Sequence, residues 1–176
     1  KEKERKVIII DIDEKSLGKF GQFPWNRKVF AKILDQLNSS NPKAIGFDIF
    51  FTEKDKQSPE AIIKSYGLIP ADVADIQNLK SPDDIFSNKL KESKSIIAVL
   101  GSNVPSHSNY NRKAKARFLS KGGDPKDFTY SYPHSIGSLE KLEKNVKGLG
   151  SISFLDQLDG IIRSLPLIVQ FDKKIY

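Results

Sequence analysis

Short apolar runs alternate with amphipathic stretches along the chain, and their order predicts an α/β fold. Three such apolar runs, of which the first is rich in β-branched residues, occupy residues 6–12, 44–51 and 95–100. Runs of this length and composition are typical of strands buried on both faces of a sheet. The sequence therefore predicts three buried strands.

Residues 27–38 separate the first two runs and have the spacing of a helix with one apolar face. Asn26 is a candidate N-cap, and Pro42 ends the helical pattern because proline cannot continue a helix. A strand, a helix and a strand with short connections predict a β-α-β unit with parallel strands. The apolar face consists of Val29, Phe30, Ile33, Leu34 and Leu37.

The second half of the chain is less regular. Residues 59–92 predict broken helices, and residues 101–135 predict a long irregular excursion with one short basic helix. A final antiparallel hairpin is expected around the Asp159-Gly160 turn. The remaining expected elements are a helix at 140–145 and strands at 148–154 and 161–171.

These elements predict a single α/β domain over residues 1–176, with a mostly parallel central sheet, flanking helices and a C-terminal antiparallel hairpin. The length of 176 residues suits one domain with a real core. The chain contains no Met, which indicates a piece of a larger protein, and no Cys, which excludes disulfides and thiolate chemistry. No segment has the ~20 apolar residues that cross a bilayer.

The net charge of +7 permits an anionic partner, but the positive charges are scattered. Because aromatic residues do not interleave with them, we expect no nucleic-acid partner. The densest basic stretch is residues 112–126, whose role the sequence leaves open.

Asp11 and Asp13 follow the first predicted strand and resemble the start of the haloacid-dehalogenase-type phosphatases. Two carboxylates and a magnesium ion suit phosphoryl transfer, because the metal neutralises charge on the transferred group. Lys15 departs from that family's pattern, which prefers a hydroxyl or small β-branched residue there. A magnesium-dependent phosphatase is therefore an alternative function, ranked below the reading that follows.

His107 and His134 have no partner at metal-ligand spacing, so we expect no metal site and no cofactor. Trp25 precedes the predicted helix, where an apolar residue can pack on the first turn. Arg27 opposes the helix macrodipole and needs a partner. We expect a salt bridge from Arg27 to Asp11, Asp13 or Asp48.

Read together, the motifs resemble the CHASE2 domain, an extracytoplasmic sensory module of bacterial adenylate cyclases, histidine kinases and related transducers. The resemblance covers nearly the full chain and is strongest at residues 7–51 and 148–168. The motifs are Ile12-Asp13-x-x-Ser16-Leu17, Gly21-x-Phe23-Pro24-Trp25-x-Arg27, Lys43-Ala44-Ile45-Gly46-Phe47-Asp48 and Asp156-x-x-Asp159-Gly160-Ile161-Ile162-Arg163.

The resemblance implies a periplasmic or extracellular domain of an inner-membrane receptor, flanked by transmembrane helices. It also implies that the domain is not itself catalytic. It would bind a small-molecule or protein signal and relay it to a cytoplasmic output domain, such as an adenylate or guanylate cyclase or a histidine kinase. A second copy of the chain is a further partner, which would form a homodimer. A purely structural dimerisation module is a further alternative function.

The family's recurrent positions predict a polar cluster near the carboxyl edge of the sheet. Its residues would bind the signal or hold the fold together. They are Asp13, Ser16, Trp25, Arg27, Asp48, Asp159 and Arg163.

Overall fold

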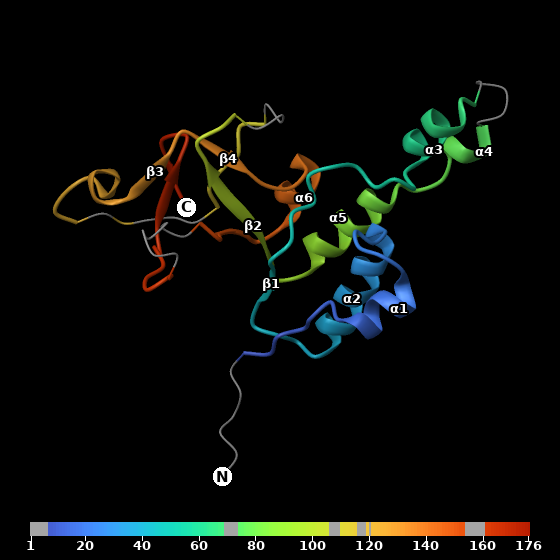
Figure 1. Ribbon diagram of the computed structural model, residues 1–176, viewed down its shortest axis with the longest axis horizontal. Coiled ribbons are helices and arrows are strands. Elements are labelled where there is room, and N and C mark those ends of the chain that lie inside the picture. The colour runs from blue at the N-terminus through green and yellow to red at the C-terminus, as the bar shows by residue number, and fades with distance from the viewer. Residues whose placement is uncertain (1–6, 69–73, 106–109, 116–118, 120, 154–160) are drawn as a thin grey trace, which may run out of the picture.

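A computed structural model describes the chain as a mixed α/β domain with two sheets (Figure 1). The described residues are 7–68, 74–105, 110–115, 119, 121–153 and 161–176. The expected α/β class is confirmed, whereas the parallel central sheet is confirmed only in part.

The central strand of the first sheet is β2, Ser95–Ser102. It pairs in parallel with β1, Ile45–Phe47, and with β5, Gly148–Ser151. Its last residues pair antiparallel with β4, His134–Ile136. Strands β1 and β2 are thus a parallel pair connected through helices, but the β-α-β unit predicted from residues 6–12, 27–38 and 44–51 is not formed. The antiparallel β4 makes the sheet mixed.

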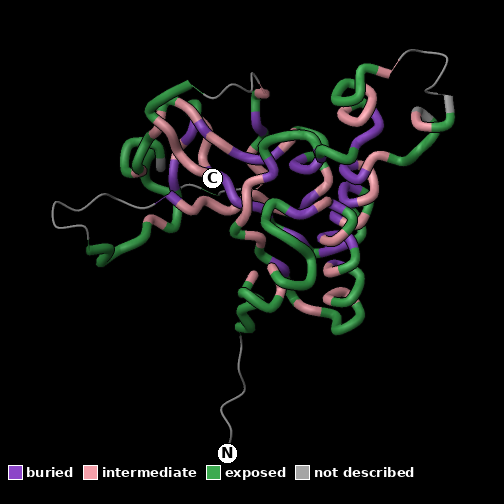
Figure 2. Tube along the Cα trace, turned by 45° about the vertical axis from the view of Figure 1, so that its right-hand side comes forward, coloured by how far each residue is buried: buried purple, intermediate pink, exposed green. Residues whose placement is uncertain are grey.

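Helices α2, Arg27–Ser39, and α5, Pro82–Glu92, lie side by side against this sheet (Figure 1). Helix α6, Glu140–Asn145, packs against α5 and confirms the helix expected there. The main core lies between these elements, and Figure 2 shows its buried positions along them. Its fully enclosed apolar side chains include Phe30, Leu34, Phe51, Phe86, Leu90, Ile97 and Leu142.

The predicted helix at 27–38 is confirmed within one residue, together with its N-cap. The Asn26 side chain accepts a hydrogen bond from the backbone N–H of Lys28 at 2.7 Å. The region 59–92 also forms the expected broken helices, α3 at Pro59–Tyr66 and α4 at Ala74–Gln77 followed by α5. Gly67, with a φ of 61°, ends α3 in the left-handed conformation that glycine favours.

The second sheet consists of β3, Tyr130–Tyr132, β6, Val169–Phe171, and β7, Lys174–Ile175. Strand β6 pairs in parallel with β3 and antiparallel with β7. The chain thus has a C-terminal antiparallel hairpin, but its turn is Asp172-Lys173. The Asp159-Gly160 turn expected from the sequence lies outside the described residues.

Several predicted strands differ from the structure in their extent: of residues 44–51 only Ile45–Phe47 form a strand, and of the described part of 148–154 only Gly148–Ser151. Residues 161–168 form no strand, and only Val169–Phe171 of the expected final strand is paired. Within the expected excursion at 101–135, β2 extends to Ser102, a 3-10 helix spans Pro125–Phe128, and β3 follows it. The described part of the predicted basic helix, residues 112–115 and 119, is not helical.

The expected first strand, residues 6–12, is wrong for its described part, residues 7–12. These residues form no strand, and Val7 to Ile10 are between 61% and 87% exposed. Helix α1, Glu14–Phe20, begins directly after them, and β1 pairs only with β2 among the described strands. A β-branched run favours extended backbone, but burial also requires a strand edge to pair with. The sequence pattern reports the first condition and not the second.

Candidate functional site

Arg27 is buried at the start of α2 and is held on three sides. Its Nε lies 3.5 Å from Oδ1 of Asp83, at the start of α5. Its Nη2 donates a hydrogen bond to the carbonyl of Glu53 at 3.1 Å, and its guanidinium lies 4.6 Å from the ring centroid of Phe51. Arg27 therefore has a carboxylate partner, as expected, but that partner is Asp83, and the predicted bridge to Asp11, Asp13 or Asp48 is wrong.

Asp55 completes this arrangement from the loop after Phe51. Its Oδ2 accepts a hydrogen bond from the backbone N–H of Arg27 at 2.6 Å, and its own N–H donates to Oδ2 of Asp83 at 2.9 Å. A carboxylate at a helix N-terminus is stabilised by the free N–H groups and the helix dipole. Asp55 thus offsets the unfavourable position of the Arg27 charge.

Burial controls the protonation of the Arg27–Asp83 pair. It raises the pKa of Asp83 above its usual value, and hydrogen bonding from the Asp55 N–H and the charge of Arg27 oppose this shift. Burial also lowers the pKa of Arg27, against the attraction of Asp83 and Asp55. The loss of water around the two charges therefore outweighs their mutual attraction.

Trp25 is only 6% exposed and belongs to an aromatic cluster. Its ring contacts Phe20, Phe23 and Phe30. Its indole Nε1 donates to the carbonyl of Gly21 at 2.6 Å, so its only polar group is satisfied. These contacts connect α1 to α2 and describe a packing role for Trp25.

Asp13 and Ser16 lie together at the start of α1. The Oδ1 of Asp13 accepts hydrogen bonds from the backbone N–H of Ser16 at 2.9 Å and from its hydroxyl at 2.7 Å. These bonds lower the pKa of Asp13. Asp11 is exposed, and the buried strand that the phosphatase reading requires before it is not formed.

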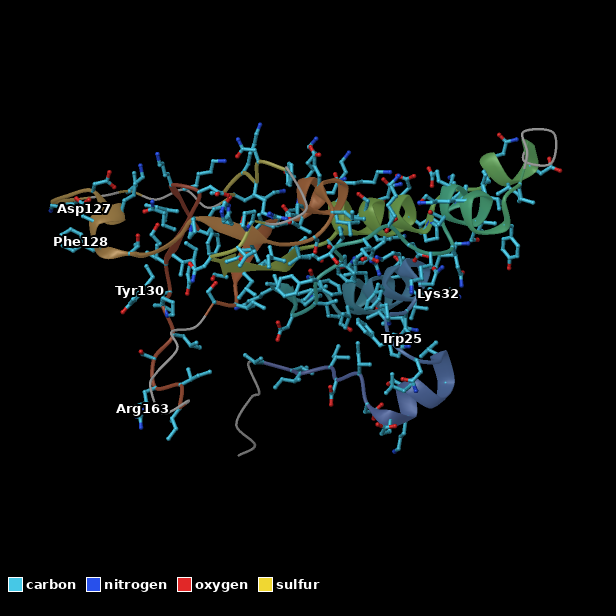
Figure 3. All side chains as sticks on the ribbon, turned by 45° about the horizontal axis from the view of Figure 1, so that its top comes forward. Trp25, Lys32, Asp127, Phe128, Tyr130 and Arg163 are labelled. Atoms are coloured by element: carbon cyan, nitrogen blue, oxygen red, sulfur yellow. The ribbon has the colours of Figure 1, made fainter. Side chains whose placement is uncertain are left out.

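Neither Asp48 nor Arg163 forms an ion pair or a hydrogen bond with Arg27, whose partners are other residues. Asp48 is exposed just after β1. Arg163 is exposed in residues 161–168, its Nη1 donates to the carbonyl of Ile161, and Figure 3 shows it well separated from Trp25. Asp159 lies outside the described residues. Of the seven predicted residues, the structure brings Asp13 and Ser16 into contact, whereas Trp25 and Arg27 are both buried but have separate partners.

A second buried ion pair joins the basic segment to α6. The Nε of Arg112 donates to Oε1 of Glu143 at 2.8 Å, and the two side chains are 2% and 1% exposed. The Nη1 of Arg112 donates to the carbonyl of Ser135 at 2.9 Å. Burial raises the pKa of Glu143, opposed first by the charge of Arg112. Oε2 of Glu143 and Nη2 of Arg112 are buried and have no hydrogen-bond partner within the described part of the chain.

A cavity of about 440 Å³ borders this ion pair. Its size lies in the range of ~300–1,000 Å³ that is usual for small-molecule sites. It is bounded by residues 110–115, α6 and β5. Its lining includes Tyr110, Lys113, Lys115, Glu140, Glu143 and Lys144.

Sequence reasoning identified the basic segment but missed Glu143. Leu139, Leu142 and Val146 pack against the main core, and Glu143 shares their helical spacing. A carboxylate on the apolar stripe of a helix requires a buried partner. That spacing could have revealed the ion pair, although not its partner Arg112.

The described residues contain neither a candidate metal-binding cluster nor a candidate membrane-spanning helix. No group of three or more His, Cys, Asp or Glu side chains is placed to hold a metal ion in the described ranges. In the same part of the chain, no helix is both long enough and apolar enough to span a bilayer.

The fold and the cavity define a mixed α/β domain with a space of ligand size beside its first sheet. The family model of the CHASE2 domain matches residues 1–176, which is the whole chain, and the chain therefore belongs to the CHASE2 family. This is an extracytoplasmic sensory domain family of signalling receptors. Searches of curated proteins and of solved structures found no match.

Proposed function

We propose that the chain is the extracytoplasmic input domain of a transmembrane signalling receptor. The observation that carries this proposal is the match of the CHASE2 family over the whole chain. On this proposal the domain is not catalytic, lies in the periplasm and is held between transmembrane helices of an inner-membrane protein. It passes its state to a cytoplasmic output domain such as an adenylate or guanylate cyclase or a histidine kinase.

A sensor of this kind works by population shift. A signal that binds one of two conformations more tightly changes their ratio, and the flanking helices carry that change across the membrane. The cavity beside Glu143 supports this proposal because it offers a place where a small signal can bind.

The first experiment examines the gene and the topology of its product. We expect apolar spans encoded before Lys1 and after Tyr176, and activity of alkaline phosphatase fused within the domain in intact bacteria. A full-length product without such spans would contradict the proposal. So would an inactive alkaline phosphatase fusion at a site where a reporter enzyme that works only in the cytoplasm is active.

A second candidate function is a dimerisation module that needs no small ligand. The exposed apolar run from Val7 to Ile10 favours it, because contiguous exposed apolar surface often marks an interface. Light scattering of the purified domain should then show a dimer that Ile9→Lys dissociates. A monomer at all accessible concentrations would argue against this module.

A further inference from the structure

The cavity beside α6 has charges that are only partly matched by the protein. Lys144 is paired with Glu140 at 2.6 Å. Lys115 donates to the neutral carbonyls of Lys144 and Val146, at 2.9 and 2.6 Å, and it forms no salt bridge within the described residues, although the charge of Glu143 attracts it. Lys113 is exposed and has no ion pair within the described residues. Two ammonium groups at this cavity are therefore available to an anion.

Glu143, which lines the same cavity, also carries a buried acceptor atom. Glu143 uses Oε1 to bind Arg112, while Oε2 is buried and unpaired. A buried polar atom without a partner costs free energy, because its bonds to water are lost and not replaced. A ligand that donates a hydrogen bond to Oε2 would recover this cost. The lining also includes the ring of Tyr110 and the side chain of Leu149, which suit a short carbon skeleton.

We propose that this cavity binds a small organic acid that also carries an amino or hydroxyl group. Its carboxylate or other anionic group contacts Lys113 and Lys115, and its amino or hydroxyl group donates to Oε2 of Glu143. Charge-assisted hydrogen bonds of this kind are stronger than neutral ones, so two of them fix both the position and the orientation of the ligand. The proposal rests on the proposed sensory function only for its biological meaning, since the binding itself is a property of the domain.

The probes are acids compared in pairs, with and without the donor group. L-malate is compared with succinate, and L-glutamate with glutarate, at millimolar concentration in thermal-shift and calorimetric titrations. A ligand that binds the folded state raises its melting temperature. We expect a donor-bearing member to bind at least about tenfold more tightly than its counterpart, a difference equal to about 1.4 kcal/mol.

Three variants separate the contacts. Lys113→Gln removes an exposed charge and should weaken both members of a pair equally. The double change Arg112→Met with Glu143→Leu replaces both partners of the buried pair, which such pairs often tolerate, and should abolish the preference for the donor. Lys141→Gln is the matched control. Lys141 lies on α6 like Glu143, but its side chain forms a salt bridge with Asp84, which does not line the cavity.

Two results would overturn the proposal. One is a wild-type domain that none of the four probes stabilises. The other is stabilisation that Lys113→Gln leaves unchanged, or a preference for the donor that the folded double variant retains. Failure of the sensory function is a distinct result: the purified domain would bind as described, while a full-length receptor would show the same output with and without the probe.

Discussion

Arg27 and Arg112 are each buried beside a carboxylate, yet the surroundings of the two pairs differ. Arg27 and Asp83 leave one atom each without a hydrogen bond, and these two atoms lie 3.5 Å from each other. Arg112 and Glu143 are closer, at 2.8 Å between Nε and Oε1. Their unpaired atoms, Nη2 and Oε2, are not the two atoms that form this contact. Glu143 also borders the cavity.

The difference indicates separate roles for the two pairs. The first joins α2, the loop at Asp55 and α5 through hydrogen bonds to the backbone and contact with Phe51. The second joins the basic segment to α6 but keeps part of its hydrogen-bonding capacity unused. Buried ion pairs are weak evidence for stability by themselves. Their neighbours decide whether a pair is structural or available to a ligand.

The largest expected effect is that of Arg27→Ala on stability. Removing one partner of a buried pair leaves the other charge uncompensated, and we expect a loss of about 3–5 kcal/mol in the free energy of unfolding. Urea denaturation followed by the fluorescence of Trp25, the only tryptophan, measures it. The control is Lys28→Ala, an exposed neighbour on the same helix. A loss no larger than that of the control would remove the structural role of Arg27.

The two pairs also show what could be predicted from the sequence. Arg27 stands in the Phe23-Pro24-Trp25 motif at the start of a helix, where its charge opposes the dipole, so its need for a carboxylate was predictable. Asp83 was not, because the expected partners were placed on a β-α-β edge that starts with a strand at residues 6–12. That strand is not formed, and the carboxylate comes instead from the N-terminus of α5.

Local patterns predicted the elements that depend on local chemistry. The apolar stripe and Asn26 cap predicted α2, and the short pattern at Glu140 predicted α6. The site of Arg112 and Glu143 depends on a long-range approach of an irregular segment to a helix. No periodicity specifies such an approach, so the sequence predicted a basic segment without a role.

The next largest effect concerns Gly137, which lies against the second pair. A Cβ at this position would lie 2.4 Å from Oε1 of Glu143 and 2.6 Å from Nε of Arg112. Gly137→Ala must therefore displace the ion pair, and we expect a loss of about 1–3 kcal/mol in urea denaturation.

The control for Gly137 is Gly46→Ala, where a Cβ would meet nothing within 4 Å. We expect it to change stability by no more than about 0.5 kcal/mol. Equal effects of the two substitutions would mean that the ion pair of Arg112 and Glu143 can move to make room for a Cβ at Gly137 without loss of stability. The pair beside the cavity would then be less rigidly held than the pair of Arg27 and Asp83.

A smaller effect is the pH dependence that each pair adds to stability. Burial raises the folded-state pKa of Glu143 above 4.5 and that of Asp83 above 3.8. A carboxyl group with a raised folded-state pKa contributes stability fully below its unfolded pKa, and this is lost as pH rises through the folded-state pKa. The stability of wild type relative to Glu143→Gln should therefore fall as pH rises from below 4.5.

The stability of wild type relative to Asp83→Asn should likewise fall as pH rises, beginning near pH 3.8. Urea denaturation of wild type and each variant across acidic and neutral pH measures both differences. A difference that rises with pH would show that attraction to the arginine outweighs burial for that pair. Opposite slopes for Asp83 and Glu143 would sharpen the contrast between them.

The smallest effect is expected at Asp13, which resembles the buried carboxylates in its bonding but not in its surroundings. Its hydrogen bonds from Ser16 lower its pKa, so its contribution is present above pH 3.8 and is lost as pH falls through the folded-state pKa. Helix α1 has no buried residue. Asp13→Ala should therefore increase amide exchange at Ser16 and Leu17 while the melting temperature stays at its wild-type value, with Glu14→Gln as the control. A fall in melting temperature approaching that of Arg27→Ala would instead mean that α1, through Ile12, Leu17 and the Trp25 cluster, unfolds together with the core.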